Sequence, residues 1–193
     1  MPARPAIDKI TVTPSLTCAP APTLTATATE TPTLTPTPAC AALTGQVLAL
    51  QIDSSWMPKP MQFNLYLPPC YDPARQPGYP VLYMLHGQTY DQDQWLRLGI
   101  VDKADSLIAA GELPPFMIVM PFEEYSLRDP FSTGFGESLT DELLPWVDAN
   151  YNTCAERECR AIGGLSRGGA WGIHLGFSRW ELFGAIGAHS VPP

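Results

Sequence analysis

The sequence contains few basic residues. Its 193 residues include 11 Lys and Arg against 19 Asp and Glu, which gives a formal net charge of −8 at pH 7. The basic residues form no cluster along the chain. Nucleic acids and anionic membrane surfaces are bound through clustered positive charge. We therefore expect neither of them as a partner.

Long hydrophobic runs are also absent. No apolar stretch reaches the roughly 20 residues that a membrane-spanning helix needs, so the sequence predicts no transmembrane segment. The first ten residues lack the apolar core of a secretory signal peptide, and no export signal is visible in this chain.

Bulky apolar side chains are scarce in the first forty residues. Residues 11–38 are mostly Thr, Pro and Ala, and Glu30 is the only charged residue among them. Such a segment cannot build a core and favours extended conformations. We predict a disordered Thr/Pro-rich linker over residues 1–40, followed by one domain over residues 41–193. Cys18 lies in this linker after a poor lipidation signal, and its lipidation stays open.

Five cysteines are more than a cytosolic enzyme of this size usually carries. Cys154 and Cys159 are close in sequence and predict one disulfide. Cys40 and Cys70 predict a second, which leaves Cys18 unpaired. Disulfides indicate an extracytoplasmic location, secreted or tethered to the cell surface, although free buried thiols are the alternative.

Two hydrophobic periodicities alternate along the rest of the chain. Residues 46–52 and 61–67 alternate in polarity, as expected of a β-hairpin. The unbroken apolar runs at residues 81–85 and 116–120 predict strands buried on both faces, and residues 159–165 and 183–188 predict two more. Helical patterns cover residues 100–108 and 139–147, the second with a capping box from Ser138 to Asp141 and a kink at Pro145. This order predicts an α/β fold with a mostly parallel sheet and helices on both faces.

The sequence Gly164-Leu-Ser166-Arg-Gly168 matches the G-x-S-x-G nucleophile elbow. In this motif a strained turn between a strand and a helix exposes a serine, which is a weak nucleophile unless it is well presented. An apolar strand precedes the motif and a helical pattern follows it, so we identify Ser166 as a candidate catalytic nucleophile. The alternative is a Gly-rich turn in which the serine is incidental.

Two other segments are expected near Ser166, because ligand sites in such sheets lie at the carboxyl ends of the strands. His86-Gly87-Gln88 follows one predicted strand, and His189 ends another. In α/β-hydrolases the oxyanion hole combines the N–H after the nucleophile with an N–H from the loop after an earlier strand. Here these are the backbone N–H groups of Arg167 and Gln88. Trp95 and His189 are candidates for the rim of the site.

Several segments together resemble the esterase D / feruloyl esterase-like family of α/β-hydrolases, which also includes mycolyltransferases of the antigen 85 type. They are residues 79–87, Asp91 with Trp95, residues 141–146, and residues 163–169. The resemblance covers residues 45–190. It implies an α/β-hydrolase fold, Ser166 as the nucleophile, and ester hydrolysis or acyl transfer without a metal or other cofactor. Many members have methionine where this chain has Arg167, but only the backbone N–H of that residue is needed.

The remaining two members of a catalytic triad are not apparent. Only 27 residues follow Ser166 (193 − 166), and Glu181 is the only acid among them. Glu181 and His189 bracket a strand, which separates them by roughly 20 Å at about 3.3 Å per residue, so they cannot form a dyad. His174 is expected to pack on its helix. Because the family places its acid and base on later loops, we expect this sequence to be truncated and this chain alone to be inactive.

Two classes of function remain compatible with the sequence. The first is a serine esterase, or an acyltransferase of the same fold, acting on a small-molecule or carbohydrate-linked ester. The second is a non-catalytic exported binding module. Four loop aromatics, Tyr90, Trp95, Tyr125 and Phe131, are candidates for an acyl pocket or for packing. The acid pairs Glu123-Glu124 and Asp91/Asp93 have no histidine at coordinating spacing, so we expect solvated charges and no metal site.

Overall fold

The computed structural model describes residues 40–191 of the chain. The linker predicted for residues 1–40, including Cys18, lies outside the described residues except for Cys40. The disulfide partners predicted from the sequence are bonded in the structure: Cys40 to Cys70, with 5.6 Å between their Cα atoms, and Cys154 to Cys159, with 5.7 Å.

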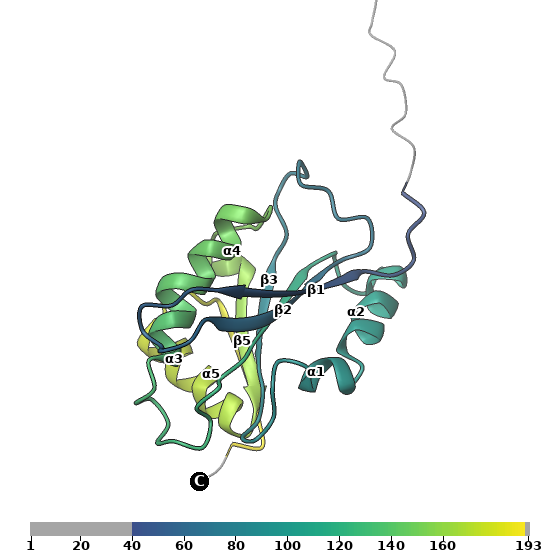
Figure 1. Cartoon of the computed structure of the whole chain (residues 1–193). Coiled ribbons are helices and arrows are strands. Elements are labelled where there is room, and N and C mark those ends of the chain that lie inside the picture. The colour runs from purple at the N-terminus through teal and green to yellow at the C-terminus, as the bar shows by residue number, and fades with distance from the viewer. Residues whose placement is uncertain (1–39, 192–193) are drawn as a thin grey trace, which may run out of the picture. The chain divides into compact units, whose positions relative to one another are not determined.

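The described chain is built on a mixed sheet of six strands in the order β1-β2-β4-β3-β5-β6 (Figure 1). β1 and β2 pair in antiparallel register with Gln46 opposite Leu67, and β2 is also antiparallel to β4. The other three pairings are parallel. The predicted hairpin and the predominantly parallel sheet are both confirmed. The strands are β1 Gln46–Ile52, β2 Met61–Leu67, β3 Val81–Leu85, β4 Met117–Pro121, β5 Arg160–Leu165 and β6 Ala185–His189.

Helices lie on both faces of the sheet, as the α/β prediction requires. In Figure 1, α1 and α2 lie on one side of the strands, and α3, α4 and α5 lie on the other. The helices are α1 Gln94–Arg97, α2 Ile100–Ala109, α3 Phe135–Glu137, α4 Leu144–Asn150 and α5 Arg167–Ser178. A 3₁₀ turn over Arg157–Cys159 leads into β5.

Two apolar clusters separate these layers. The larger lies under α3–α5 and includes the fully buried Tyr83 of β3 and Trp171 of α5. Successive strand residues point to opposite faces, so Leu82 and Met84 of β3 join the smaller cluster near α2. Both are only half-buried, which corrects the expectation that β3 is buried on both faces. All five residues of the edge strand β6 are exposed.

The segment from residue 135 to residue 150 differs from the prediction of one helix capped at Ser138. The chain is already helical at Phe135, passes through a π-helical turn over Ser138–Leu143, and continues as α4. The Ser138 hydroxyl caps nothing; it donates to Glu142 and accepts from Ser54. Pro145 has no N–H to bond the carbonyl of residue 141, and the wider π turn accommodates that missing bond. Ser138 therefore lies inside a continuous helical path and not at the start of a helix.

Candidate active site

Ser166 lies at the sharp turn between β5 and α5. Its backbone dihedrals are φ 53° and ψ −113°, a region that a residue with a side chain rarely adopts. Two backbone hydrogen bonds hold the turn. The Ser166 N–H donates to the His189 carbonyl at 2.7 Å, and the Ala170 N–H donates to the Ser166 carbonyl at 2.9 Å. The strand-to-helix turn predicted for the elbow motif is therefore present, and its strain falls on the serine itself.

The two glycines of the motif are required by close packing rather than by their own dihedrals. A Cβ atom on Gly168 would lie 2.3 Å from the carbonyl oxygen of Leu85. A Cβ on Gly164 would lie 2.5 Å from the carbonyl carbon of Gly168. Real Cβ atoms do not approach backbone this closely. The glycines thus let the elbow rest directly on the end of β3, which carries the His86 loop.

The elbow and the His86 loop border one hollow. It is lined by Gln88, Arg128, Pro130, Ser166, Arg167 and Ala170. Within residues 40–191, the backbone N–H groups of Gln88 and Arg167 have no hydrogen-bond partner. The Arg167 N–H is also the first of α5, whose N-terminal dipole favours negative charge. Ser166 and the two predicted oxyanion donors are thus brought together.

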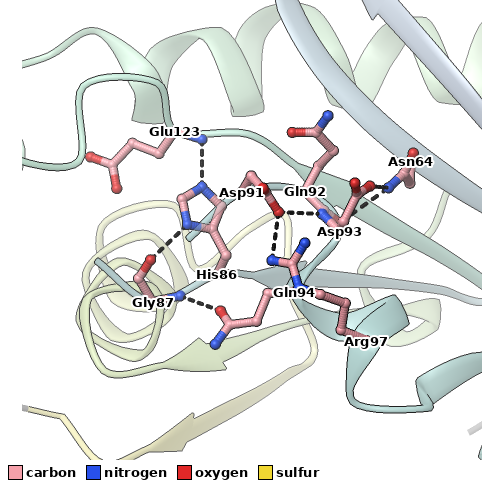
Figure 2. A network of polar contacts seen from close by, with 9 residues as sticks. All are labelled: Asn64, His86, Gly87, Asp91, Gln92, Asp93, Gln94, Arg97 and Glu123. Atoms are coloured by element: carbon pink, nitrogen blue, oxygen red, sulfur yellow. Dashed lines mark hydrogen bonds and ion pairs between the residues drawn. The ribbon is translucent and has the colours of Figure 1, made fainter. Parts of the chain in front are cut away.

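The His86 loop is fixed by side chains on both sides of Gly87 (Figure 2). The Gly87 N–H donates to Gln94 Oε1 at 2.7 Å, and the Gly87 carbonyl lies 2.8 Å from His86 Nδ1. His86 Nε2 accepts from the backbone N–H of Glu123 at 2.8 Å. Because that N–H can only donate, Nε2 carries a lone pair and the ring proton is on Nδ1. Burial lowers the pKa of His86 below its ordinary value, which favours this neutral form.

Glu123 is buried, and this corrects the expectation of a solvated loop charge. Its side chain is 3 % exposed and pairs with Arg167, which is 7 % exposed. The contact is bidentate: Arg167 Nε donates to Oε2 at 2.8 Å and Nη2 donates to Oε1 at 2.6 Å. The third guanidinium nitrogen, Nη1, donates to the Arg128 carbonyl at 2.8 Å. The sequence analysis missed this pair because its members are 44 residues apart.

The acid pair Asp91/Asp93 supports the same loop from the outside (Figure 2). Asp91 pairs with Arg97 at 2.8 Å and also accepts from the Asp93 backbone N–H at 3.0 Å. Asp93 in turn accepts from Asn64 of β2 at 2.7 Å. These contacts tie the start of α1 to the sheet and so help to place Gln94 beside Gly87.

The two predicted rim residues lie in a second, apolar hollow over β3, β5 and β6. The Trp95 indole N–H donates to the Leu85 carbonyl at 3.2 Å. The His189 carbonyl holds the elbow, while its ring Nδ1 lies 2.8 Å from the Ser190 hydroxyl. Trp95 thus lies outside the hollow that contains Ser166, and His189 reaches the elbow through its backbone. Their contact with substrate stays a prediction.

The remaining candidates, for the triad or for an acyl pocket, make other contacts. Glu181 pairs with Arg179 at 3.0 Å. His174 of α5 stacks on Phe131, with 4.2 Å between ring centroids. Tyr125, another aromatic candidate, packs against the Arg128 guanidinium at 4.6 Å. Within residues 40–191, no histidine ring is hydrogen-bonded to the Ser166 hydroxyl; the contact with His189 is between backbone groups.

Two further kinds of feature are absent from the described part of the chain. Residues 40–191 contain no group of three His, Cys, Asp or Glu side chains arranged to hold a metal ion. None of the helices in that range has the length and apolar character to cross a bilayer.

Known proteins are similar to this chain in both sequence and fold. A sequence model of the family described as "Putative esterase" matches residues 54–193. An endo-1,4-beta-xylanase/feruloyl esterase of Xylanibacter ruminicola is 36% identical over 139 residues, 64% of this chain and 18% of that protein. An esterase of Mycobacterium tuberculosis is 34% identical over 138 residues, 67% of this chain and 28% of that protein.

Solved structures give the same fold. A ferulic acid esterase superposes with a TM-score of 0.66 at 26% identity, over 75% of this chain and 59% of that chain. A ferulic acid esterase from Anaeromyces mucronatus gives a TM-score of 0.67 at 24% identity, over 75% of this chain and 58% of that chain. The chain therefore spans less than a third of the two curated relatives and under two thirds of these two structures. The family match covers most of its length, and the chain belongs to this esterase family, whose members have the α/β-hydrolase fold.

Proposed function

We propose that this protein is a serine carboxylic-ester hydrolase in which Ser166 is the nucleophile. One observation carries the proposal: the strained elbow presents Ser166 in the same hollow as the backbone N–H groups of Gln88 and Arg167, which have no hydrogen-bond partner among residues 40–191. A nucleophile and a pair of preorganised donors are the parts that acyl chemistry needs on the enzyme side.

The reaction proceeds through an acyl-enzyme. The Ser166 Oγ attacks the ester carbonyl carbon as a general base takes its proton, which later passes to the leaving alcohol. The carbonyl oxygen becomes an oxyanion that accepts from Gln88 N–H and Arg167 N–H. Each such donor stabilises the transition state by about 3–4 kcal/mol in known cases. The tetrahedral intermediate collapses, expels the alcohol and leaves the acyl group on Oγ. Water then attacks the acyl carbon and releases the acid.

The general base is the part that residues 40–191 do not supply. His86 has both ring nitrogens engaged, and His174 and His189 make the contacts described above. We therefore propose that the printed chain carries the nucleophile and the oxyanion hole without the triad acid and histidine. Loss of a triad base slows such reactions by several orders of magnitude. The chain by itself should turn over esters only slowly.

The names of the relatives bear on the substrate, and the two disulfides bear on the location. The names of the relatives, feruloyl and ferulic acid esterases, favour a small-molecule or carbohydrate-linked ester such as a ferulate. The two disulfides favour an oxidising, extracytoplasmic compartment.

Ester cleavage with an external base tests the proposal. Hydrolysis of 4-nitrophenyl acetate and methyl ferulate is measured with imidazole added in place of the missing histidine. Ser166→Ala should remove the protein-dependent rate. Ser178→Ala, which alters an exposed serine at the other end of α5, should leave it unchanged. Equal rates for the wild type and Ser166→Ala would refute the assignment of the nucleophile.

A further inference from the structure

We infer that Glu123 is a positioning residue that holds both oxyanion donors in register, one through His86 and the other through Arg167. The inference rests on the proposed function, because it takes the Gln88 and Arg167 N–H groups as the oxyanion hole. Glu123 itself makes no hydrogen bond to Ser166 within the described residues and does not line the hollow that contains it. It acts through the loop after β3 and through the elbow after β5.

The first connection runs through the backbone of Glu123. Its N–H occupies His86 Nε2 at 2.8 Å and so keeps the ring proton on Nδ1. Nδ1–H then donates to the Gly87 carbonyl at 2.8 Å. A ring with its proton on Nε2 would face the Glu123 N–H with a second donor and would leave the Gly87 carbonyl without one. The position of the Glu123 backbone therefore selects the tautomer that can hold Gly87.

Holding the Gly87 carbonyl also aims the Gln88 N–H. The carbonyl of residue 87 and the N–H of residue 88 belong to one planar peptide unit, and in a trans peptide they point in opposite directions. The cis peptide within the described residues is elsewhere, at Gln76–Pro77. Fixing one end of the unit against His86 thus directs the other end away from the histidine. Gln88 lines the hollow with Ser166.

The second connection runs through the Glu123 carboxylate. Both of its oxygens accept from the Arg167 guanidinium, at 2.6 and 2.8 Å. Arg167 is the residue whose backbone N–H is the other donor, and it follows the nucleophile directly. A bidentate arginine–carboxylate contact fixes orientation as well as distance. The same guanidinium binds the Arg128 carbonyl, which brings the loop bearing Arg128 to the edge of the hollow.

Glu123 has a rigid base from which to act on both sides. It follows the end of β4 by two residues, and the intervening Phe122 N–H donates to the Gln62 carbonyl of β2 at 2.8 Å. The loops after β3, β4 and β5 therefore meet at this single glutamate. An oxyanion hole depends on donors held within tenths of an ångström before reaction begins. A buried, fully paired glutamate joined to both donors meets that need.

The test combines a spectroscopic measurement with a kinetic one on the 193-residue chain. Two variants are made: Glu123→Gln, and Glu123→Gln with Arg167→Met. The double variant leaves no unpaired buried charge, and it remains informative if the single variant does not fold. Nitrogen-15 NMR reports the tautomer of the His86 ring and the chemical shift of the Gln88 amide. The rate of Ser166 acylation by 4-nitrophenyl acetate, with imidazole added, reports the oxyanion hole.

Asp148→Asn is the matched control. It removes the charge from the other buried ion pair, Arg160–Asp148, which lies at the opposite end of β5. Both variants keep the N–H of residue 123 but lose the carboxylate contacts that hold its backbone in place beside His86. We therefore expect the backbone to shift, and both variants to show a mixture of His86 tautomers and a shifted Gln88 amide. Their acylation should slow by about tenfold or more, since complete loss of one donor costs about 10²–10³. The control should change neither readout.

The inference is overturned if the folded Glu123 variants keep a single Nδ1–H tautomer and an unshifted Gln88 amide. It is also overturned if Asp148→Asn produces the same changes, because the effect would then be general loosening. Failure of the proposed function has a different signature, namely equal acylation of the wild type and Ser166→Ala. In that case the His86 and Gln88 signals still decide whether Glu123 fixes this loop.

Discussion

Two buried arginines lie at opposite ends of strand β5, and their guanidinium groups are held in different ways. Arg160 opens the strand and pairs with Asp148 of α4, with side chains 7 % and 18 % exposed. Its Nε has no hydrogen-bond partner within the described residues. Arg167, just beyond the carboxyl end of the strand, uses all three guanidinium nitrogens on Glu123 and the Arg128 carbonyl.

A hydrogen bond attaches Arg160 to its partner, whereas those of Arg167 also fix the orientation of its guanidinium group. One charge-assisted hydrogen bond from Nη2 attaches Arg160 to α4, and it holds the guanidinium through a single nitrogen. Two parallel bonds and a third to another loop leave Arg167 a single orientation. The chain thus places its fully satisfied ion pair at the end of the sheet where Ser166 lies, and its partly satisfied pair at the other end. Only the first pair includes a residue that lines the hollow with Ser166.

Removing the arginine of the site pair should give the largest loss of stability. Arg167→Met leaves the Glu123 carboxylate buried without its partner, and such losses cost about 3–5 kcal/mol. Urea unfolding measures the change. Adding Glu123→Gln to this variant should recover a large part of the loss, because the unpaired charge is then gone. A single variant as stable as the wild type would show that the pair is not held as described.

Breaking the other pair should cost less and should spare the site. In Asp148→Asn the amide oxygen can still accept from Arg160, and Asp148 is partly exposed, so we expect a loss of about 1–2 kcal/mol. The same urea experiment measures it. Acylation of Ser166 should be unchanged. If acylation fell as much as in the Glu123 variants, the two arginines would not differ in the way proposed.

Mild acid should have the smallest of these effects on stability, and it should act through His86. Burial lowers the pKa of His86 in the folded protein, whereas the unfolded chain has an ordinary histidine pKa of about 6.5. Below about pH 6.5 the unfolded state therefore binds more protons, and stability falls as the pH falls toward the lowered pKa. Stability measured from pH 7.5 to 5 should show this slope, and His86→Gln should reduce it. An unchanged slope in that variant would assign the acid sensitivity to other groups.

Local sequence signals were sufficient for the fold and for the strand-to-helix turn at Ser166. The alternation in residues 46–52 and 61–67 and the apolar runs around residues 81–85 located strands, because each pattern reflects which face of a strand is buried. The elbow could be recognised because its two glycines and its serine lie within five consecutive residues, where the close packing leaves no room for a larger residue at either glycine.

The residues around that turn could not be read in the same way. Glu123-Glu124 looks like a pair of solvated acids, and only the fold brings Arg167 against the first of them. Gln94 has no local signal at all, yet it holds the Gly87 N–H. Ser138 fits a capping pattern, but the helical path begins earlier at Phe135 and the π turn takes its place. The contacts that decide these roles are made by the fold, as with Glu123 and Arg167, which are 44 residues apart.

The most direct measurement is to locate the acyl group after reaction with 4-nitrophenyl acetate and imidazole. Intact mass and peptide mapping are compared for the wild type and Ser166→Ala. We predict one acetyl group on the peptide that contains Ser166, and none on that peptide in the variant. An unmodified Ser166, or the same acetylation in Ser166→Ala, would contradict the assignment of this serine as the nucleophile.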